Sequence, residues 1–144
     1  MVSPGFFIIC AVHSVVAITC GSLLMFCSEE MVVLSHGREQ ASKLIGSTAH
    51  DQLLIRTSDS FSGLLLTAVG VLVLMVAFVK DREFQSFFAK GCVFLHLMMA
   101  IWRLSFEREI LLLAHDCLRL LLADFAFGLS WLFFLVCSWT EMYD

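Results

Sequence analysis

The amino-acid sequence predicts an all-α, polytopic integral membrane protein: a four-transmembrane-helix bundle with an amphipathic interfacial helix before the fourth span. Hydrophobic residues make up 60% of the 144 residues, whereas an ordinary soluble domain is about 45–50% apolar. Charged residues make up 15%, against about 25% in soluble domains. A water-soluble fold of this length has too little interior for so much apolar surface, and a lipid environment removes that problem. We expect residues 1–144 to form a single membrane domain.

The first predicted span covers residues 4–27. Pro4 suits the first turn of a helix, because its missing N–H would be unpaired there anyway. Roughly 20 residues, at about 1.5 Å each, cross a hydrocarbon core of about 30 Å. A cleaved signal peptide is the alternative, but the run is long for one and no Lys or Arg precedes it. Small side chains recur along one stripe of this helix, at Cys10, Ser14, Ala17 and Gly21.

Residues 28–60 form a polar segment in which acids, bases and two histidines are mixed. This composition is too polar to span a bilayer, and the segment is too long for a tight turn. We expect a loop with a short amphipathic helix near residues 38–45, whose apolar side chains rest on the membrane surface. Long loops of this kind are often functional.

The second predicted span, residues 61–79, carries no charge. Gly63, Thr67 and Gly70 form a stripe of small residues like the one on the first helix. Small residues let two helix backbones approach closely, which is how helices associate in lipid. We therefore expect helix packing between Ser14, Ala17 and Gly21 of the first span and Gly63, Thr67 and Gly70 of the second.

The third predicted span, residues 84–104, is less apolar, because Lys90 and Arg103 lie within it. Each is close to one end, so its charge can reach the headgroup layer. The fourth span is placed at residues 120–139, after an amphipathic helix that begins near Ser105. Trp102 and Trp139 fall near the predicted membrane borders, where such rings are favoured. A chain with three spans is the main alternative.

Two histidines lie within predicted spans. His13 is in the first span and His96 is in the middle of the third. Two histidines at similar depth on adjacent helices are weak candidates for binding haem or a metal, which requires both rings to face one cavity. The alternative, which we favour, is that each histidine bonds to a polar group of a neighbouring helix. We therefore expect no cofactor and no metal.

A second candidate polar cluster lies around the start of the fourth span. His115, Asp116 and Arg119 can meet on one helical turn. Asp124 follows five residues after Arg119, and Arg103 is its expected partner on the third helix. A carboxylate at membrane depth is costly unless it is paired, and it is a functional candidate by default. The cluster is either a headgroup or proton site or an ion-pair network that fixes the hairpin, and we favour the network.

No catalytic motif appears in the sequence. The metalloprotease, nucleophile-elbow and phosphate-loop patterns are all missing. The cysteines lack the CxxC spacing of a zinc or redox site. The second span has no polar catalytic side chain. We predict no catalytic residues, and no basic cluster indicates a nucleic-acid partner.

The arrangement of spans resembles the small four-helix membrane proteins of unknown role that occur in plants. A fainter resemblance is to the ergosterol-biosynthesis scaffold family, four-helix proteins of the endoplasmic reticulum that tether sterol enzymes. Arg56-Thr57 before the second span is similar to that family's Arg-Thr-Phe-Gly stretch, and His96 is similar to its His-Phe-Leu segment. Ser58-Asp59 replaces the Phe-Gly, and no acid follows His96 within its helix. The resemblance implies an endoplasmic reticulum or other endomembrane location.

These observations favour a non-catalytic accessory subunit or tether in a membrane complex. Its expected partners are the lipid bilayer and either another membrane protein or further copies of itself. A small lipid-modifying or haem- or metal-binding membrane enzyme is the alternative.

Overall fold

The computed structural model describes residues 3–106 and 117–143. Within these ranges every regular element is an α-helix, which confirms the predicted all-α class for this part of the chain. Four of the helices are long and apolar enough to cross a membrane. In chain order the elements are α1 (Pro4–Phe26), α2 (Ser28–Leu44), α3 (Ala49–Val76), α4 (Arg82–Phe106) and α6 (Cys117–Tyr143).

Local side chains account for where several helices begin. Pro4 occupies the first turn of α1. The Thr48 hydroxyl caps α3 by accepting a hydrogen bond of 3.2 Å from the Asp51 N–H. At the start of α4, Asp81 Oδ1 accepts a bond of 2.9 Å from the Glu83 N–H. Such caps satisfy N–H groups that have no partner within the first turn of a helix.

The polar segment over residues 28–60 differs from the predicted loop, because most of it is helical. α2 occupies Ser28–Leu44, and α3 begins at Ala49 rather than at residue 61. Gly37, with φ 75° and ψ 161°, interrupts α2. Good helix formers such as Glu, Met, Leu, Gln and Ala fill this segment, so polarity alone did not predict a loop correctly. The amphipathic helix expected before the fourth span lies largely outside the described residues.

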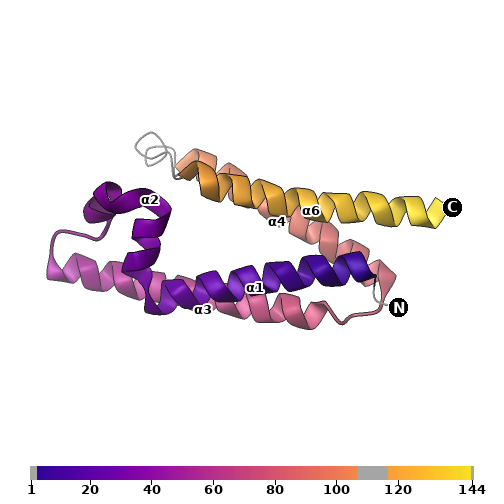
Figure 1. Ribbon diagram of the computed structural model, residues 1–144, viewed down its shortest axis with the longest axis horizontal. Helices are drawn as coiled ribbons and strands as arrows, with labels where there is room; N and C mark the ends of the chain where they lie inside the picture. The colour runs from indigo at the N-terminus through magenta and orange to yellow at the C-terminus, as the bar shows by residue number, and fades with distance from the viewer. Residues whose placement is uncertain (1–2, 107–116, 144) are drawn as a thin grey trace.

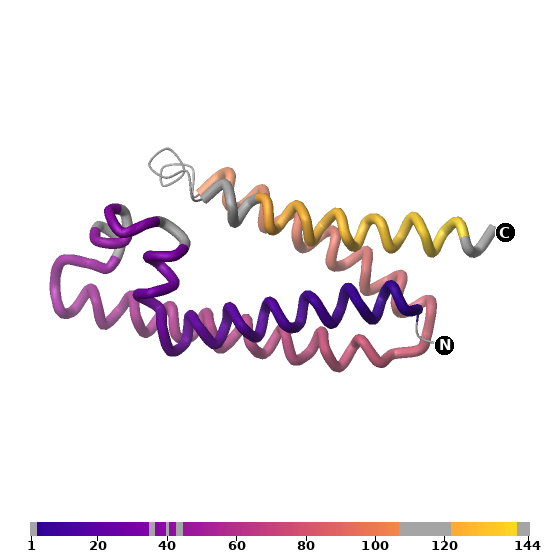
Figure 2. The backbone as a smooth tube through the Cα atoms, in the orientation of Figure 1, coloured from indigo at the N-terminus to yellow at the C-terminus, as the bar shows by residue number. Residues whose placement is uncertain are grey.

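The four long helices form two antiparallel pairs, α1 with α3 and α4 with α6 (Figure 1). α1 begins and α6 ends at the same end of the molecule. At the opposite end, α2 contacts both α1 and α6 and so joins the two pairs. The first part of α3 continues past the end of α1 along the long axis (Figure 2).

The two pairs meet in a core to which all four long helices contribute, near the end where α1 begins. Phe6 packs edge-on against Trp131, with ring centroids 5.9 Å apart, and its ring is tilted against that of Phe134, at 5.4 Å. Trp131 and Phe6 are fully buried. The remaining buried members of this cluster are small residues, namely Cys10, Ala77 and Ala89. Large rings against small side chains allow the helices to interdigitate at high density.

Candidate functional site

The small residues predicted on the first and second spans lie at the contact between α1 and α3. A side-chain carbon added at Gly21 would stand 2.7 Å from both the Gly63 carbonyl oxygen and the Thr67 nitrogen. Gly70 faces Ile18 and Ala17 in the same way. The Ser14 hydroxyl donates a hydrogen bond of 2.6 Å to the Gly70 carbonyl oxygen. This contact brings together Ser14, Ala17, Gly21, Gly63, Thr67 and Gly70, the six residues proposed for helix packing.

His13 and His96 meet directly. Their Nε2 atoms are 2.9 Å apart, so one ring donates its N–H to the other across the α1–α4 boundary. The Phe127 ring of α6 lies against both of them, with a centroid distance of 4.0 Å to His13. Neither Nδ1 atom, both of which are buried, has a hydrogen-bond partner among the described residues.

Asp124 of α6 is buried and forms an ion pair with Arg103 of α4. Arg103 Nε donates to Asp124 Oδ2 at 2.7 Å. Asp124 Oδ1 lies 3.9 Å from His96 Nδ1, which is too far for a direct hydrogen bond. His13, His96, Asp124 and Arg103 therefore form a row of polar side chains across three helices, which we call the polar row.

Three residues of the second candidate cluster cannot be placed with it. His115 and Asp116 lie outside the described residues, and so does the side chain of Arg119. The two that are described, Arg103 and Asp124, pair across the helices. Spacing along α6 could not have found the contact of Asp124 with His96, because that contact depends on how α4 is rotated.

The histidine pair leaves no room for a haem in this arrangement. Two axial histidines stand on opposite sides of the iron, with their nitrogens roughly 4 Å apart and a porphyrin between them. The Nε2 atoms here touch at hydrogen-bond distance instead. Within the described ranges, no group of three or more His, Cys, Asp or Glu side chains could hold a metal ion.

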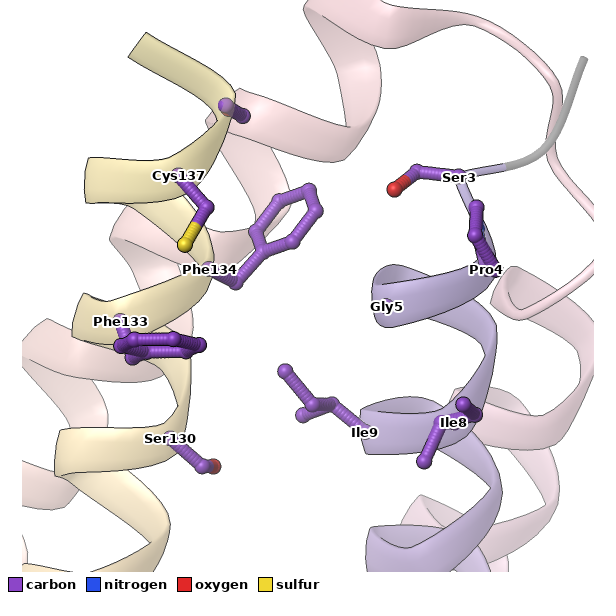
Figure 3. Close-up of a pocket in the computed structure, with 10 residues that line it drawn as sticks. Ser3, Pro4, Gly5, Ile8, Ile9, Ser130, Phe133, Phe134 and Cys137 are labelled. Atoms are coloured by element: carbon purple, nitrogen blue, oxygen red, sulfur yellow. The ribbon is translucent and has the colours of Figure 1, made fainter. Parts of the chain in front are cut away.

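Two apolar clefts open at the helix boundaries. The larger, of about 410 Å³, lies between the start of α1 and residues 130–138 of α6. Figure 3 shows Phe134 of α6 and Ile9 of α1 projecting into the space between the two helices, with Ser3 beside the start of α1. The smaller, of about 180 Å³, runs between α4 and α6, and His96 and Asp124 are among its lining residues. We call this second cleft the α4–α6 groove.

Two contributing residues were not singled out by the sequence. Phe127 was one of many phenylalanines, and only the fold places it on the histidines. Gln85 is buried and donates a bond of 2.8 Å from Nε2 to the Val79 carbonyl oxygen, which ties the α3–α4 turn. The sequence does place a single glutamine next to the break between two spans. Because a buried amide requires a hydrogen-bond partner, that position could have predicted a bond from Gln85 to the turn.

The fold and the polar row define a class: small all-helical proteins with four helices apolar enough to cross a membrane and a polar row between them. A family model described as a domain of unknown function, DUF7865, matches residues 1–132. The chain belongs to this family. No curated protein and no solved structure matches it significantly.

Proposed function

We propose that this protein is an integral membrane protein in which α1, α3, α4 and α6 cross the bilayer. The helices contain 23 to 28 residues, so at about 1.5 Å per residue each exceeds a hydrocarbon core of about 30 Å. Large apolar side chains on all four helices are exposed, among them Val15, Leu72, Phe94 and Phe133. In water such a surface would drive aggregation, whereas in lipid it is solvated.

Within the membrane, we propose a non-catalytic accessory subunit or tether. The observation that carries this proposal is the polar row, in which Arg103 bonds to Asp124 and His13 bonds to His96. These groups hold helices together, which makes a rigid bundle for presentation to a partner. A membrane enzyme would instead be expected to direct such groups into a water-filled or substrate-filled cavity.

The first part of α3 is the surface we propose for a partner. α3 has 28 residues and at about 1.5 Å each is roughly 42 Å long, so about 12 Å extends beyond a 30 Å core. Leu53 and Leu54 lie in this extension with 64% and 57% of their surface exposed. Exposed leucines outside the lipid layer are suited to packing against another protein.

Affinity purification of the full chain in mild detergent tests this proposal. We expect one abundant membrane protein to be retained, or further copies of the chain. The double change of Leu53→Glu and Leu54→Glu should reduce recovery of the partner to background. The control pair, Ala49→Glu and His50→Glu, is exposed in the same extension of α3 and should retain it. A monodisperse monomer from the unmodified chain would contradict the accessory role.

The second candidate is a small lipid-modifying membrane enzyme, and the position of His96 and Asp124 on the α4–α6 groove favours it. It predicts that Asp124→Ala abolishes an activity without lowering protein abundance. An absorbance scan of the purified protein tests the haem-binding form, which requires a Soret band.

The proposed location is the endoplasmic reticulum or another endomembrane, and co-localisation with organelle markers tests it.

A further inference from the structure

The larger of the two clefts, between the start of α1 and residues 130–138 of α6, has mainly apolar walls; we call it the α1–α6 cleft. Ile8 and Ile9 line it on the α1 side, and Phe133 and Phe134 line it on the α6 side. Ile9 and Phe134 project into the space between the two helices (Figure 3). The described residues that line the cleft include no charged side chain. The cleft therefore offers a ligand van der Waals contact and no ionic interaction.

Water is a poor occupant of this cleft. A buried water needs about two to four polar partners. Among the described lining side chains, only three serines carry a hydroxyl group. The hydroxyl of Ser130 already donates a hydrogen bond of 2.7 Å to the Phe127 carbonyl oxygen. A volume of about 410 Å³ holds many more waters than these hydroxyl groups can bind.

A transmembrane helix of a partner is too large for the cleft. Ser130 and Ser138, the first and last lining residues on α6, are eight residues apart, so the cleft extends about 12 Å along that helix. A helix with its side chains is at least about 10 Å in diameter, and a 12 Å length of it occupies roughly 900 Å³. The cleft measures about 410 Å³, so a helix would remain largely outside. An extended hydrocarbon chain is slimmer and can lie in the cleft lengthwise.

The depth of the cleft also suits a lipid chain. Phe7 of α1 lies level with Phe78, just after α3, because their rings pack edge to face with centroids 5.7 Å apart. The charged turn Lys80–Glu83 begins two residues after Phe78 and belongs in the headgroup layer or in water. Ser3 lies about 6 Å before Phe7 along the chain axis, and Ile9 lies about 3 Å after it. The cleft therefore runs inward from the membrane border.

We propose that the α1–α6 cleft binds one hydrocarbon chain of a bilayer phospholipid. The chain enters beside Ser3 and Ser138 and packs on the isoleucines of α1 and the phenylalanines of α6. Its headgroup stays in the headgroup layer, near the charged turn. Such a chain occupies space that the two helix pairs leave open and makes van der Waals contacts with both of them. The proposal rests on the proposed membrane insertion.

Native mass spectrometry of the full chain, released from nanodiscs of phosphatidylcholine, counts the lipids that stay bound. A chain held between two helices has contacts on both sides, so it should outlast lipids that touch only one outer face. We expect one phosphatidylcholine to be retained per protein. Nanodiscs of phosphatidylglycerol should give the same number, because the described lining residues carry no charge.

Gly5 allows the cleft to be filled from the α1 side. A side-chain carbon added there would stand 3.9 Å from both Phe134 Cδ2 and Ser3 Oγ, which is ordinary van der Waals contact. Gly5→Phe should therefore abolish retention of the lipid, whereas Gly5→Ala, which adds one methyl group, should preserve it. The matched control is Gly91→Phe, which should also preserve it. A side-chain carbon at Gly91 meets nothing within 4 Å, and Gly91 does not line the cleft.

Cys137→Trp fills the cleft from the α6 side and should have the same effect as Gly5→Phe. This second variant keeps the test available if the first does not fold. Retention of no lipid by the unmodified chain would overturn the proposal. Equal retention by Gly91→Phe and by the two filled variants would also overturn it. So would a protein dimer without lipid that Gly5→Phe dissociates, because a second copy would then occupy the cleft.

A phosphatidylcholine with a diazirine in its chain serves as the insertion control. If it labels the outer faces of the helices while no lipid is retained, only the cleft site fails. If it labels none of the four long helices, membrane insertion itself is wrong.

Discussion

Two single residues, Gly21 and Gly63, determine how closely α1 and α3 pack. A methyl group at Gly21 would approach backbone atoms of Gly63 and Thr67 to 2.7 Å, and backbone cannot rotate away as a side chain can. A close approach of this kind gives the helices extensive van der Waals contact, on which association in lipid depends. Gly91 of α4, in contrast, would meet nothing within 4 Å.

Gly21→Ala is therefore expected to destabilise the protein by about 1–3 kcal/mol, the usual cost of overpacking. Unfolding by SDS in mixed detergent micelles, followed by circular dichroism, measures this change. The control is Gly91→Ala, which should be neutral or stabilising by up to about 1 kcal/mol, because alanine favours helix over glycine. Equal effects of the two changes would show that α1 and α3 do not pack through this face.

The histidine pair offers a second prediction at this scale. His13→Phe removes one partner and leaves His96 Nε2 buried and unsatisfied, which should cost about 1–3 kcal/mol. Replacing both histidines by phenylalanine removes the donor and the acceptor together, and should recover most of that loss. Stability of the two variants in the same SDS titration checks the difference. A double variant less stable than the single one would argue against a purely structural hydrogen bond.

Residue identity and helical spacing were enough to suggest the α1–α3 contact, because small residues recur on one face of each helix. The sequence also suggested that His13 and His96 lie at similar depth. It did not indicate that they touch, since a single sequence contains no information on how α1 and α4 are rotated. The same limit hid Phe127 and the contact of Asp124 with His96.

At the scale of elements, the α4–α6 hairpin is held by an ion pair that is mostly shielded from solvent. The side chains of Arg103 and Asp124 are 21% and 9% exposed. Arg103 lies three residues before the end of α4, so the pair closes the hairpin near its loop end. A charge left without its partner in such a position is strongly unfavourable.

A double-mutant cycle on Arg103→Ala and Asp124→Ala measures this pair. Each single change should lower stability by about 2–4 kcal/mol, slightly less than for a fully buried pair because Arg103 is partly exposed. The double change should cost less than the sum, with a coupling of about 1–3 kcal/mol. Strict additivity would mean that the pair contributes nothing to holding α4 and α6 together.

The polar segment shows where element prediction from composition fails. Low hydropathy predicted that residues 28–60 do not span a bilayer by themselves, and α2 is not among the four helices apolar enough to cross one. Low hydropathy does not exclude a helix, however, because charged residues such as Glu and Lys are good helix formers. The break at Gly37 and the Thr48 cap divide this segment, and caps are more informative than hydropathy about helix ends.

At the scale of the whole molecule, composition is the most informative property of the sequence. The number of apolar helices followed from counting long uncharged or weakly charged runs, and the four candidate spans agree with it. Pairing of α1 with α3 agrees with the matching stripes of small residues on the two helices. Connection length does not predict it, because the shortest connection between two of the long helices joins α3 to α4, which belong to different pairs. The packing of one pair on the other depends on Phe6, Trp131 and Phe134, whose meeting no sequence period predicts.

We propose that apolar side chains on the outside of this bundle face lipid, whereas the aromatic core is shielded from it. Trp131 and Phe133 test this most directly. They are two positions apart on α6, so they differ by only about 3 Å in depth. Trp131 is 0% exposed, whereas Phe133 is 69% exposed. Two single-tryptophan proteins are needed: one retaining Trp131, and one carrying Phe133→Trp with every native tryptophan changed to phenylalanine.

Fluorescence quenching by bilayers of brominated phosphatidylcholine distinguishes these two proteins. We expect strong quenching of the tryptophan at position 133 and weak quenching of Trp131. Equal quenching at both positions would contradict the packing of the bundle, and no quenching at either would contradict its insertion into the membrane.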